Sequence, residues 1–250
     1  MSRTLDAVVL CGGRGTRLGA LTAETPKPLL PVEGAPFLLR LLQRLHADGC
    51  GHVVLAASYR GEQVEAFVTA HRAELPEVTV VVEPEPLGTG GALRLAASRV
   101  RSEVFVALNG DSWLAQPIGP VVARHRSSGW PMTVVLVEAS RVVGGARDKA
   151  RCVVGRDGRL QQFATEAMIG SGWINGGLYV IDRAAALAWP ADAYSLEQRL
   201  LARVPGGPGA FQSEAALLDI GTPACYEAAG RWLERGGAPP MATLQSGWRA

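Results

Sequence analysis

The sequence predicts an α/β fold in which helices cover both faces of a mostly parallel central sheet and an antiparallel hairpin lies at the sheet edge. In the first half of the chain, short apolar runs alternate with segments of helical periodicity, as in successive βαβ units. These runs are almost entirely apolar, which is typical of strands buried on both faces. In the second half, two strand-like runs flank an Asp-Gly turn, which indicates the hairpin.

The first half contains four expected strands, at 7–10, 53–57, 78–82 and 104–108. Helices are expected between them, because leucines recur at helical spacing from Leu38 to Leu45 and the apolar positions of 62–71 follow the same period. A third helix has its apolar face within 93–100. The regular alternation of strand and helix predicts right-handed connections and parallel strands.

The second half is expected to hold strand 132–137, hairpin 151–163, strand 173–181, helix 195–203 and strand 216–219. Glycines interrupt strand 173–181, which is typical where a ligand or another backbone passes close. Ser195 is the expected N-cap of its helix. The last strand ends on Asp219, and Thr222-Pro223 then begins another helix.

Length and composition predict one domain over 1–235 followed by a C-terminal tail at 236–250. The chain of 250 residues is 48% hydrophobic and 19% charged, as in a globular protein with a sizeable core. No apolar stretch approaches the ~18 residues of a membrane span, and Met1 to Thr4 lead directly into the first strand. We therefore expect a cytoplasmic protein without a membrane partner. The sequence leaves homo-oligomer formation open.

Charge and cysteine usage exclude several classes of function. The formal net charge of +2 and the absence of basic runs with interleaved aromatics argue against a nucleic-acid partner. The cysteines lack the CxxC spacing of metal sites and are expected to be reduced and buried; they are Cys11, Cys50, Cys152 and Cys225. Of the 25 Lys and Arg residues, only Lys27 and Lys149 are lysines. A compact ammonium is the simplest reason to keep lysine at Lys27.

A glycine-rich loop follows the first strand and predicts a phosphate site. Gly12, Gly13 and Gly15 let backbone N–H groups approach an anion closely, and three cations stand nearby in the sequence: Arg14, Arg17 and Lys27. Leu18 stands where a dinucleotide-binding loop needs its last glycine, and the Gly-Lys-Ser/Thr ending of a P-loop is absent. The loop is therefore a phosphate-binding loop of another kind than these two.

Two further loops follow buried strands. The segment Glu83-Pro84-Glu85-Pro86-Leu87-Gly88-Thr89-Gly90-Gly91 is a second glycine-rich loop, suited to a nucleotide base or phosphate. Asn109-Gly110-Asp111 places a carboxylate at the end of a strand, where open α/β sheets bind their ligands. Asp219 ends the last short strand in the same way.

The stretch Gly12-Gly13-x-Gly15-Thr16-Arg17-Leu18, followed by Pro26-Lys27-Pro28-Leu29-Leu30-Pro31, closely resembles the two-part signature of the sugar-1-phosphate nucleotidyltransferases. The resemblance spans about 6–234 and implies a Rossmann-like three-layer sandwich of the nucleotide-diphospho-sugar transferase type. It implies a nucleotide-binding half at about 1–115 and a sugar-binding half at about 116–235. The implied reaction joins a nucleoside triphosphate to a sugar 1-phosphate and releases pyrophosphate.

The resemblance also assigns roles to residues. It implies catalytic roles for Arg17, Lys27 and Asp111, and a Mg²⁺ ion held by Asp111 and Asp219. The implied nucleotide-binding residues are Leu10, Gly12, Gly13, Gly15, Thr16, Glu83, Leu87, Gly88, Thr89, Asn109 and Gly110. The implied sugar-binding residues are Gly90, Glu166, Asn175 and Gly176.

One position departs from the family pattern. The family commonly carries a lysine in a Phe-x-Glu-Lys stretch after the hairpin, where it contacts the sugar phosphate. The corresponding stretch here, Phe163-Ala164-Thr165-Glu166, is followed by no lysine. Either Lys149 or Arg151 is a replacement, or the role is unfilled.

Three stretches favour a particular pair of substrates. Leu87-Gly88-Thr89-Gly90-Gly91, Leu108-Asn109-Gly110-Asp111 and Ile174-Asn175-Gly176-Gly177 are most similar to the small heptose 1-phosphate guanylyltransferases. GTP and heptose 1-phosphate are therefore favoured. The alternatives are mannose, glucose or N-acetylmuramic acid 1-phosphate with UTP, ATP, CTP or dTTP.

Two other classes of function fit the sequence less well. A non-catalytic subunit that senses nucleotide sugars could dispense with Lys27, Asp111 and Asp219, yet all three are present. A dinucleotide-dependent oxidoreductase is disfavoured, because Leu18 breaks the glycine pattern and Glu33 lies in a Pro-x-Glu-Gly turn instead of ending a strand.

Overall fold

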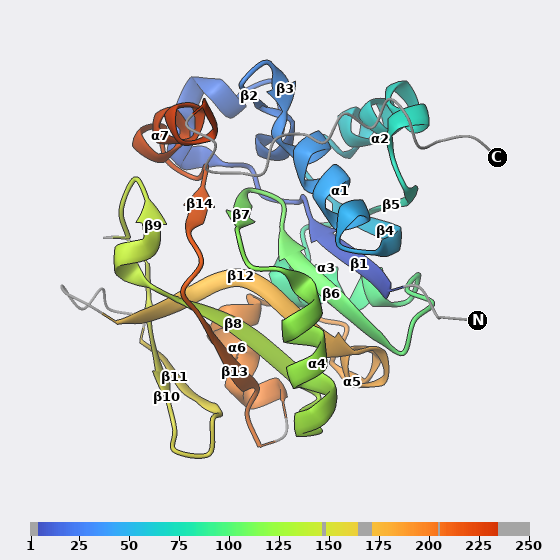
Figure 1. The fold of residues 1–250 in the computed structure, drawn as a ribbon. Helices are drawn as coiled ribbons and strands as arrows, with labels where there is room; N and C mark the ends of the chain where they lie inside the picture. Colours follow the sequence, from blue (N-terminus) through green and yellow to red (C-terminus); the bar gives the residue numbers. More distant parts are fainter. Residues whose placement is uncertain (1–4, 147–148, 165–171, 205, 235–250) are drawn as a thin grey trace.

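A computed structural model describes residues 5–146, 149–164, 172–204 and 206–234 (Figure 1). Within these ranges, nine strands form one mixed sheet, and seven of them follow the order β11-β10-β12-β6-β1-β4-β5. Strand β8 pairs with both β12 and β13. The nine strands are β1 (Leu5–Leu10), β4 (Cys50–Ala57), β5 (Glu77–Val82), β6 (Val104–Asn109), β8 (Met132–Glu138), β10 (Arg151–Val154), β11 (Leu160–Ala164), β12 (Trp173–Asp182) and β13 (Gly209–Ser213).

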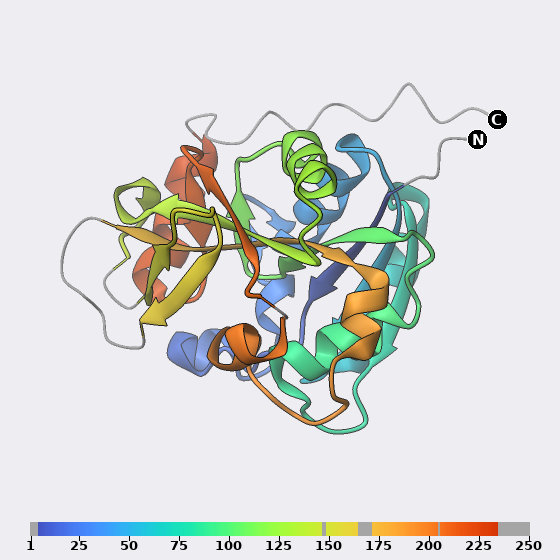
Figure 2. The same cartoon turned by 90° about the horizontal axis from the view of Figure 1, so that it is seen from below.

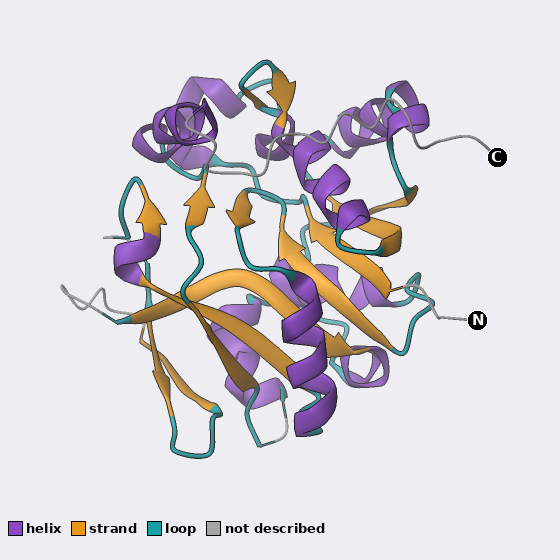
Figure 3. Ribbon diagram, in the orientation of Figure 1, coloured by secondary structure: helices purple, strands orange, loops and turns teal. Residues whose placement is uncertain are grey.

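Helices and small sheets complete the fold (Figure 3). The α-helices are α1 (Phe37–Ala47), α2 (Gly61–Ala70), α3 (Gly88–Ala97), α4 (Ile118–Ser128), α5 (Arg183–Ala188), α6 (Leu196–Arg203) and α7 (Pro223–Glu234). The 3₁₀ helices are η1 (Thr16–Thr22), η2 (Lys27–Leu29), η3 (Arg72–Glu74) and η4 (Ala139–Arg141). A three-stranded sheet has the order β7 (Ser112–Leu114), β14 (Leu217–Asp219) and β9 (Val142–Val143), and a hairpin joins β2 (Pro31–Val32) to β3 (Ala35–Pro36).

The large sheet separates two hydrophobic cores, and Figure 2 shows helices on both of its sides. Successive strand residues face opposite cores, so that Ala7 and Val9 pack with α1, α2, α4 and α7 while Val8 packs with α3, α5 and α6. Burial on both faces explains why these strands are apolar throughout. The three-layer arrangement follows directly from this alternation.

The fold class predicted from the sequence is confirmed. The strands β6, β1, β4 and β5 are parallel, and β10 and β11 form the expected antiparallel hairpin. The antiparallel part is larger than the hairpin alone, because β12 runs antiparallel to both β6 and β8. Strand β12 carries the expected irregularity: its pairing with β8 shifts between Asn175 and Tyr179, and Gly177 adopts a φ of 69°.

The segment expected as a second glycine-rich loop is a loop only in part. Helix α3 begins at Gly88, so that Gly88-Thr89-Gly90-Gly91 forms the first helical turn. The expectation of a loop through Gly91 was therefore wrong. Gly90 allows the difference: its N–H donates to the carbonyl of Tyr194, and its lack of a Cβ lets the ring of Tyr194 pack directly against the turn.

Among the described helices, none has the length and apolar character that crossing a membrane requires.

Buried polar groups tie α4 to the sheet. The two ring nitrogens of His125 lie 2.9 Å from Thr133 Oγ1 and 3.2 Å from Asp182 Oδ1. Burial lowers the pKa of His125 below its usual value of 6.5, although the hydrogen bond and charge of Asp182 oppose this shift. The folded protein thus favours the neutral imidazole.

This burial predicts a pH-dependent stability. Below about pH 6.5 the unfolded chain binds the His125 proton more readily than the folded chain, so acid favours unfolding. The free energy of unfolding is expected to fall between about pH 7 and about pH 5, and less steeply in His125→Gln. Urea unfolding at each pH measures this. The control is His71→Gln at the end of α2; equal changes of slope in both variants would contradict the explanation.

Candidate active site

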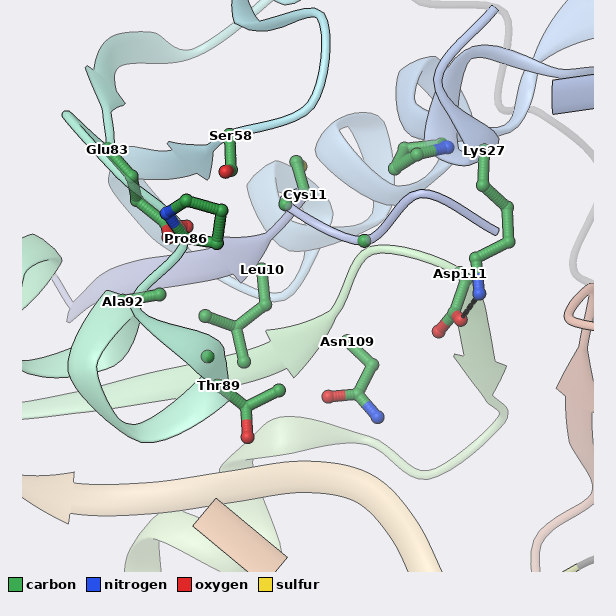
Figure 4. A pocket seen from close by; sticks show the side chains of 14 residues that line it. Leu10, Cys11, Lys27, Ser58, Glu83, Pro86, Thr89, Ala92, Asn109 and Asp111 are labelled. Carbon is green, nitrogen blue, oxygen red and sulfur yellow. Dashed lines mark hydrogen bonds and ion pairs between the residues drawn. The ribbon is translucent and has the colours of Figure 1, made fainter. Parts of the chain in front are cut away.

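The carboxyl ends of β1, β4 and β6 meet at one pocket, together with the loop after β5 and the start of α3 (Figure 4). The pocket is lined by Leu10, Cys11, Gly12, Gly13, Lys27, Pro28, Ser58, Glu83, Pro86, Gly88, Thr89, Ala92, Asn109 and Asp111. Figure 4 shows Glu83 and Pro86 at one end and Lys27 and Asp111 at the other. The pocket therefore joins a buried acidic group beside apolar side chains to a charged end.

The glycine-rich loop after β1 is held close to its neighbours. A Cβ at Gly12 would lie 2.8 Å from Glu83 Oε1 and 3.1 Å from Ser58 Cβ, so only glycine fits this approach without a shift. Gly15 has a φ of 65°, and its carbonyl accepts a hydrogen bond from Thr22 Oγ1 at 3.0 Å. These contacts fix the backbone that faces the pocket.

Tyr59 holds the outer part of the same segment. Its hydroxyl donates to the carbonyl of Ala23 at 2.8 Å, and the guanidinium of Arg14 lies over its ring, 5.6 Å from the centroid. Arg60 donates to the Tyr59 hydroxyl at 3.1 Å and to the Ala23 carbonyl at 2.9 Å. The turn after β4 therefore orients the loop and one of its cations. Sequence reasoning did not single out Tyr59, since an aromatic residue in a turn carries no motif.

Lys27 and Asp111 form an ion pair at the charged end of the pocket. Their side chains are 12% and 21% exposed, so the pair lies inside the cleft and still reaches solvent. Lys27 begins η2 between Pro26 and Pro28, which restrict the backbone on both sides. Ser112 donates its hydroxyl to Asp111 Oδ1 at 3.0 Å.

The pKa of Asp111 reflects opposing effects. Burial alone raises it, but the charge and hydrogen bond of Lys27 and the hydrogen bond from Ser112 lower it, and the charge of Lys149 adds to this. The net result is a pKa below the usual value. Asp111 is consequently an anion at neutral pH.

Strand β14 brings Asp219 beside Asp111. Asp219 pairs with Ser112 in the antiparallel ladder of β14 and β7, and the N–H of Ile220 donates to the carbonyl of Asp111 at 3.0 Å. Opposed residues in such a ladder have Cα atoms roughly 4.5–5.5 Å apart. Asp219, at the end of β14, thus lies beside Asp111, which directly precedes β7.

Cations surround Asp219. Lys149 forms an ion pair with its Oδ2 atom, and the N–H of Gly221 donates to its Oδ1 atom at 2.6 Å. A Cβ at Gly221 would lie 3.1 Å from Arg17 Nη2, which places the Arg17 guanidinium at the same turn. Lys27, Lys149 and Arg17 therefore gather around two carboxylates.

This donor set suits a Mg²⁺ ion that also binds substrate phosphates. Mg²⁺ prefers oxygen ligands and is commonly held by one or two carboxylates together with phosphates and water. Among the described residues, no group of three His, Cys, Asp or Glu side chains is arranged to hold a metal. A site with only Asp111 and Asp219 matches a metal that arrives with a phosphate ligand.

Glu83 lies at the opposite end of the pocket. Its Oε2 atom accepts the N–H of Leu87 at 2.8 Å, and its side chain is largely buried. Burial raises the pKa of Glu83 above its usual value, although the hydrogen bond from Leu87 opposes this. A buried carboxylate next to the apolar surfaces of Leu10 and Pro86 can accept N–H groups from a planar ring.

The residues expected to contact sugar are engaged within the protein. Asn175 donates its amide to the hydroxyl of Tyr179 at 2.6 Å and accepts the N–H of Gly177 at 2.9 Å. Gly176 packs against β8, since a Cβ there would lie 3.0 Å from the carbonyl of Val135. Glu166 lies outside the described residues.

A polar network connects this region to the pocket. Glu197 accepts hydrogen bonds from Ser195 Oγ at 3.0 Å and from Thr89 Oγ1 at 3.2 Å. Thr89 in turn accepts the N–H of Leu196 at 2.7 Å, and Ser195 caps α6 by accepting the N–H of Gln198. The start of α3 and the start of α6 are thereby fixed to each other.

The structure sorts the expected nucleotide-binding residues into two groups. Those that line the pocket are Leu10, Gly12, Gly13, Glu83, Gly88, Thr89 and Asn109. Those that instead shape the surrounding backbone are Gly15, Thr16, Leu87 and Gly110. Pocket residues outside the expected set include Cys11, Pro28, Ser58, Pro86 and Ala92. Ser58 could have been found from its place directly after a buried strand.

Residues 6–143 match the family described as nucleotidyl transferase. D-glycero-alpha-D-manno-heptose 1-phosphate guanylyltransferase from Aneurinibacillus thermoaerophilus is 30% identical over 92% of this chain and 99% of that protein. Mannose-1-phosphate guanylyltransferase from Mycobacterium tuberculosis is 36% identical over 72% of this chain, but the match spans only 49% of that protein.

Solved structures show the same likeness. HddC from Yersinia pseudotuberculosis superposes with a TM-score of 0.81 and 28% identity, covering 92% of this chain and 99% of HddC. A structure of HddC complexed with GMP-PN gives a TM-score of 0.80, also with 28% identity, over 91% of this chain and 99% of HddC.

The packing of Gly90 predicts a structural effect of substitution. In Gly90→Ala the new Cβ would overlap the ring of Tyr194, so the first turn of α3 and the Tyr194 ring must move apart. We expect a loss of roughly 1–3 kcal/mol in the free energy of unfolding, measured by urea denaturation. Gly119→Ala in α4 is the control, because its Cβ would meet no atom within 4 Å. Equal stability of the two variants would refute the packing role.

Proposed function

We propose that this chain, which belongs to the nucleotidyl transferase family, joins a nucleoside triphosphate to a sugar 1-phosphate, with GTP and heptose 1-phosphate favoured. The family expected from the glycine-rich signature is thus confirmed. The observation that carries the proposal is the ion pair of Lys27 and Asp111 at one end of a pocket lined by that signature, with Asp219 on the strand that pairs beside Asp111. The products are a nucleoside diphosphate sugar and pyrophosphate.

The reaction is an in-line displacement at phosphorus. An oxygen of the sugar phosphate attacks the α-phosphorus of the triphosphate, and the bond from that phosphorus to the oxygen bridging to the β-phosphorus breaks. Pyrophosphate leaves with the bonding electrons. The attacking oxygen is already ionised, so no general base is needed, and catalysis consists of positioning and electrostatic stabilisation.

The main obstacle is repulsion between two polyanions. Two unit charges ~4 Å apart repel by roughly 4 kcal/mol at an effective dielectric constant of 20. In this proposal Lys27, beside Asp111, lowers the repulsion between the sugar phosphate and the α-phosphate, and Arg17, beside Gly221, stabilises the departing pyrophosphate. Asp111 and Asp219 would hold Mg²⁺, which when bound neutralises phosphate charge and orients the α-phosphate.

Glu83 supports the preference for guanine. A guanine ring presents adjacent N–H donors, at N1 and at the exocyclic N2 amino group, which a carboxylate can accept together. Glu83 lies at the end of the pocket away from Lys27 and Asp111, where a base would sit when the phosphates occupy the charged end (Figure 4). The GMP-PN complex of HddC is in keeping with this assignment.

The sugar is assigned by similarity. The relative aligned over 99% of its own length is named for heptose 1-phosphate, which favours that substrate. Mannose 1-phosphate is the second candidate, because a relative named for it is 36% identical. A non-catalytic sensor is disfavoured by the shared position of Lys27, Asp111 and Asp219, since sensing requires no such cluster of charges.

Removal of either partner of the Lys27–Asp111 pair is expected to lower kcat by roughly 10²–10³, the loss typical of one preorganised stabilising group. The substitutions are Lys27→Ala and Asp111→Asn, and release of pyrophosphate is the readout. The control is Arg99→Ala, which removes an exposed charge beyond the far end of α3. Near-normal turnover in either site variant would contradict the assigned roles.

A matrix of nucleoside triphosphates against sugar 1-phosphates, assayed with Mg²⁺, tests the substrate pair. GTP with heptose 1-phosphate is expected to give the highest kcat/KM. In Glu83→Gln the value for GTP is expected to fall by about tenfold to a hundredfold, since one bidentate contact to a base contributes roughly 1–3 kcal/mol of discrimination. Glu85→Gln, an exposed carboxylate of the same loop, is the matched control.

The same assignment gives a pH dependence. As pH falls through the raised pKa of Glu83, the carboxyl becomes protonated and loses an acceptor for guanine. The advantage of GTP over ATP should therefore shrink toward acidic pH in the wild-type protein and stay constant in Glu83→Gln. A preference for GTP over ATP that does not change as the pH falls would exclude Glu83 as the group that recognises the base.

If no pair of nucleoside triphosphate and sugar 1-phosphate reacts in the substrate matrix, the proposed enzymatic function is wrong.

A further inference from the structure

The two lysines of the chain occupy the two carboxylates of the site. Lys27 pairs with Asp111 Oδ2 and Lys149 pairs with Asp219 Oδ2. In each aspartate the other oxygen accepts a local hydrogen bond: Ser112 donates to Oδ1 of Asp111, and the N–H of Gly221 donates to Oδ1 of Asp219. The Oδ2 atoms are therefore the oxygens that a metal ion could take only in competition with a lysine.

The two lysines differ in their relation to the nucleotide pocket. Lys27 lines the pocket, whereas Lys149 does not. The charge of Lys149 nevertheless influences Asp111 as well as Asp219, so its ammonium lies within electrostatic reach of both carboxylates. Lys149 therefore lies near the charged end of the pocket without lining the pocket itself.

Arg151 holds the backbone carbonyl of Lys149, while the Lys149 side chain extends to Asp219. Arg151 is buried and donates through Nη1 to the carbonyl of Lys149 at 3.0 Å and to that of Ala146 at 3.3 Å. Before this segment, β9 pairs with β14, the strand that carries Asp219. Arg151 is thus engaged with backbone carbonyls. The Lys149 side chain ends in an ammonium on a flexible four-carbon stem that is 21% exposed.

We propose that Lys149 exchanges partners during the reaction cycle: it neutralises Asp219 in the metal-free protein, and binds the phosphate of the sugar 1-phosphate once Asp219 Oδ2 accepts a divalent cation. This inference rests on the function proposed above. The exchange keeps Asp219 neutralised in both states and delivers a positive charge to the incoming anion. Lys149 is on this account a substrate-binding residue on the sugar side of the site.

The exchange predicts effects of opposite sign in one variant. Lys149→Ala removes the competitor for Asp219 Oδ2, so the free protein should bind Mn²⁺ more tightly, by about twofold to fivefold for a partly exposed ion pair. The same variant loses a charged contact to the sugar phosphate, so the KM for the sugar 1-phosphate should rise by about tenfold or more. A merely structural role of Lys149 would weaken both kinds of binding.

The metal arm uses Mn²⁺ alone, with no nucleotide present, and counts free Mn²⁺ by electron paramagnetic resonance. Arg156→Ala is the matched control, because it removes an exposed cation from the turn of the β10–β11 hairpin. It should change neither Mn²⁺ affinity nor the KM for the sugar. Lys149→Arg keeps the charge, but an arginine leaves a carboxylate less readily than a lysine does. It should therefore not tighten Mn²⁺ binding, and it should restore the KM for the sugar 1-phosphate only in part.

The kinetic arm uses the sugar 1-phosphate with the highest kcat/KM. Unchanged or weaker Mn²⁺ binding in Lys149→Ala would overturn the exchange, and so would failure of both proteins to bind Mn²⁺. An unchanged KM for the sugar would overturn the phosphate contact while leaving the proposed reaction intact. If the wild-type protein joins no substrate pair, the proposed function fails, and the Mn²⁺ arm still decides whether Lys149 and the metal compete.

Discussion

The pairing of β7 with β14 is the contact on which the site depends. It sets Asp219 opposite Ser112, although the two residues are more than a hundred positions apart in the chain. Without this ladder, each aspartate would be an isolated carboxylate at the end of a short strand. With it, two negative charges lie close together, which is favourable only because lysines or a metal ion neutralise them. The cations around the aspartates are therefore a requirement of the fold as well as of the chemistry.

The parallel and antiparallel parts of the large sheet contribute differently to the site. The parallel strands β6, β1, β4 and β5 present their carboxyl ends to the nucleotide pocket, as open α/β sheets do. The antiparallel strand β12 continues the sheet and brings Asn175 and Tyr179 near the start of α6. Glu197 joins these parts through Thr89, whose helix begins at the pocket. The start of α3 at the pocket is thereby linked to the antiparallel part of the sheet.

The sequence was sufficient for the fold and for much of the pocket, for local reasons. The spacing of apolar residues predicts buried strands and amphipathic helices. A glycine such as Gly12 predicts that other groups approach the backbone closely, as Glu83 and Ser58 do. The extra antiparallel pairing of β12 could not be read in this way, because partners of a strand depend on contacts far along the chain. The first turn of α3 was misjudged for a related reason: glycines usually indicate a loop, and here Tyr194 packs against them.

The ion pair of Lys149 with Asp219 could not be predicted from the sequence either, since the two residues lie 70 positions apart. The composition nevertheless pointed to both lysines. A chain with 25 cationic residues has only two lysines, and both contact the site aspartates. An arginine binds a carboxylate through two parallel N–H···O bonds and is difficult to displace. A lysine offers one compact ammonium on a flexible stem, which can leave a carboxylate for a phosphate. Exchange of partners at the site thus gives a physical reason for lysine at Lys149 in a chain that otherwise uses arginine.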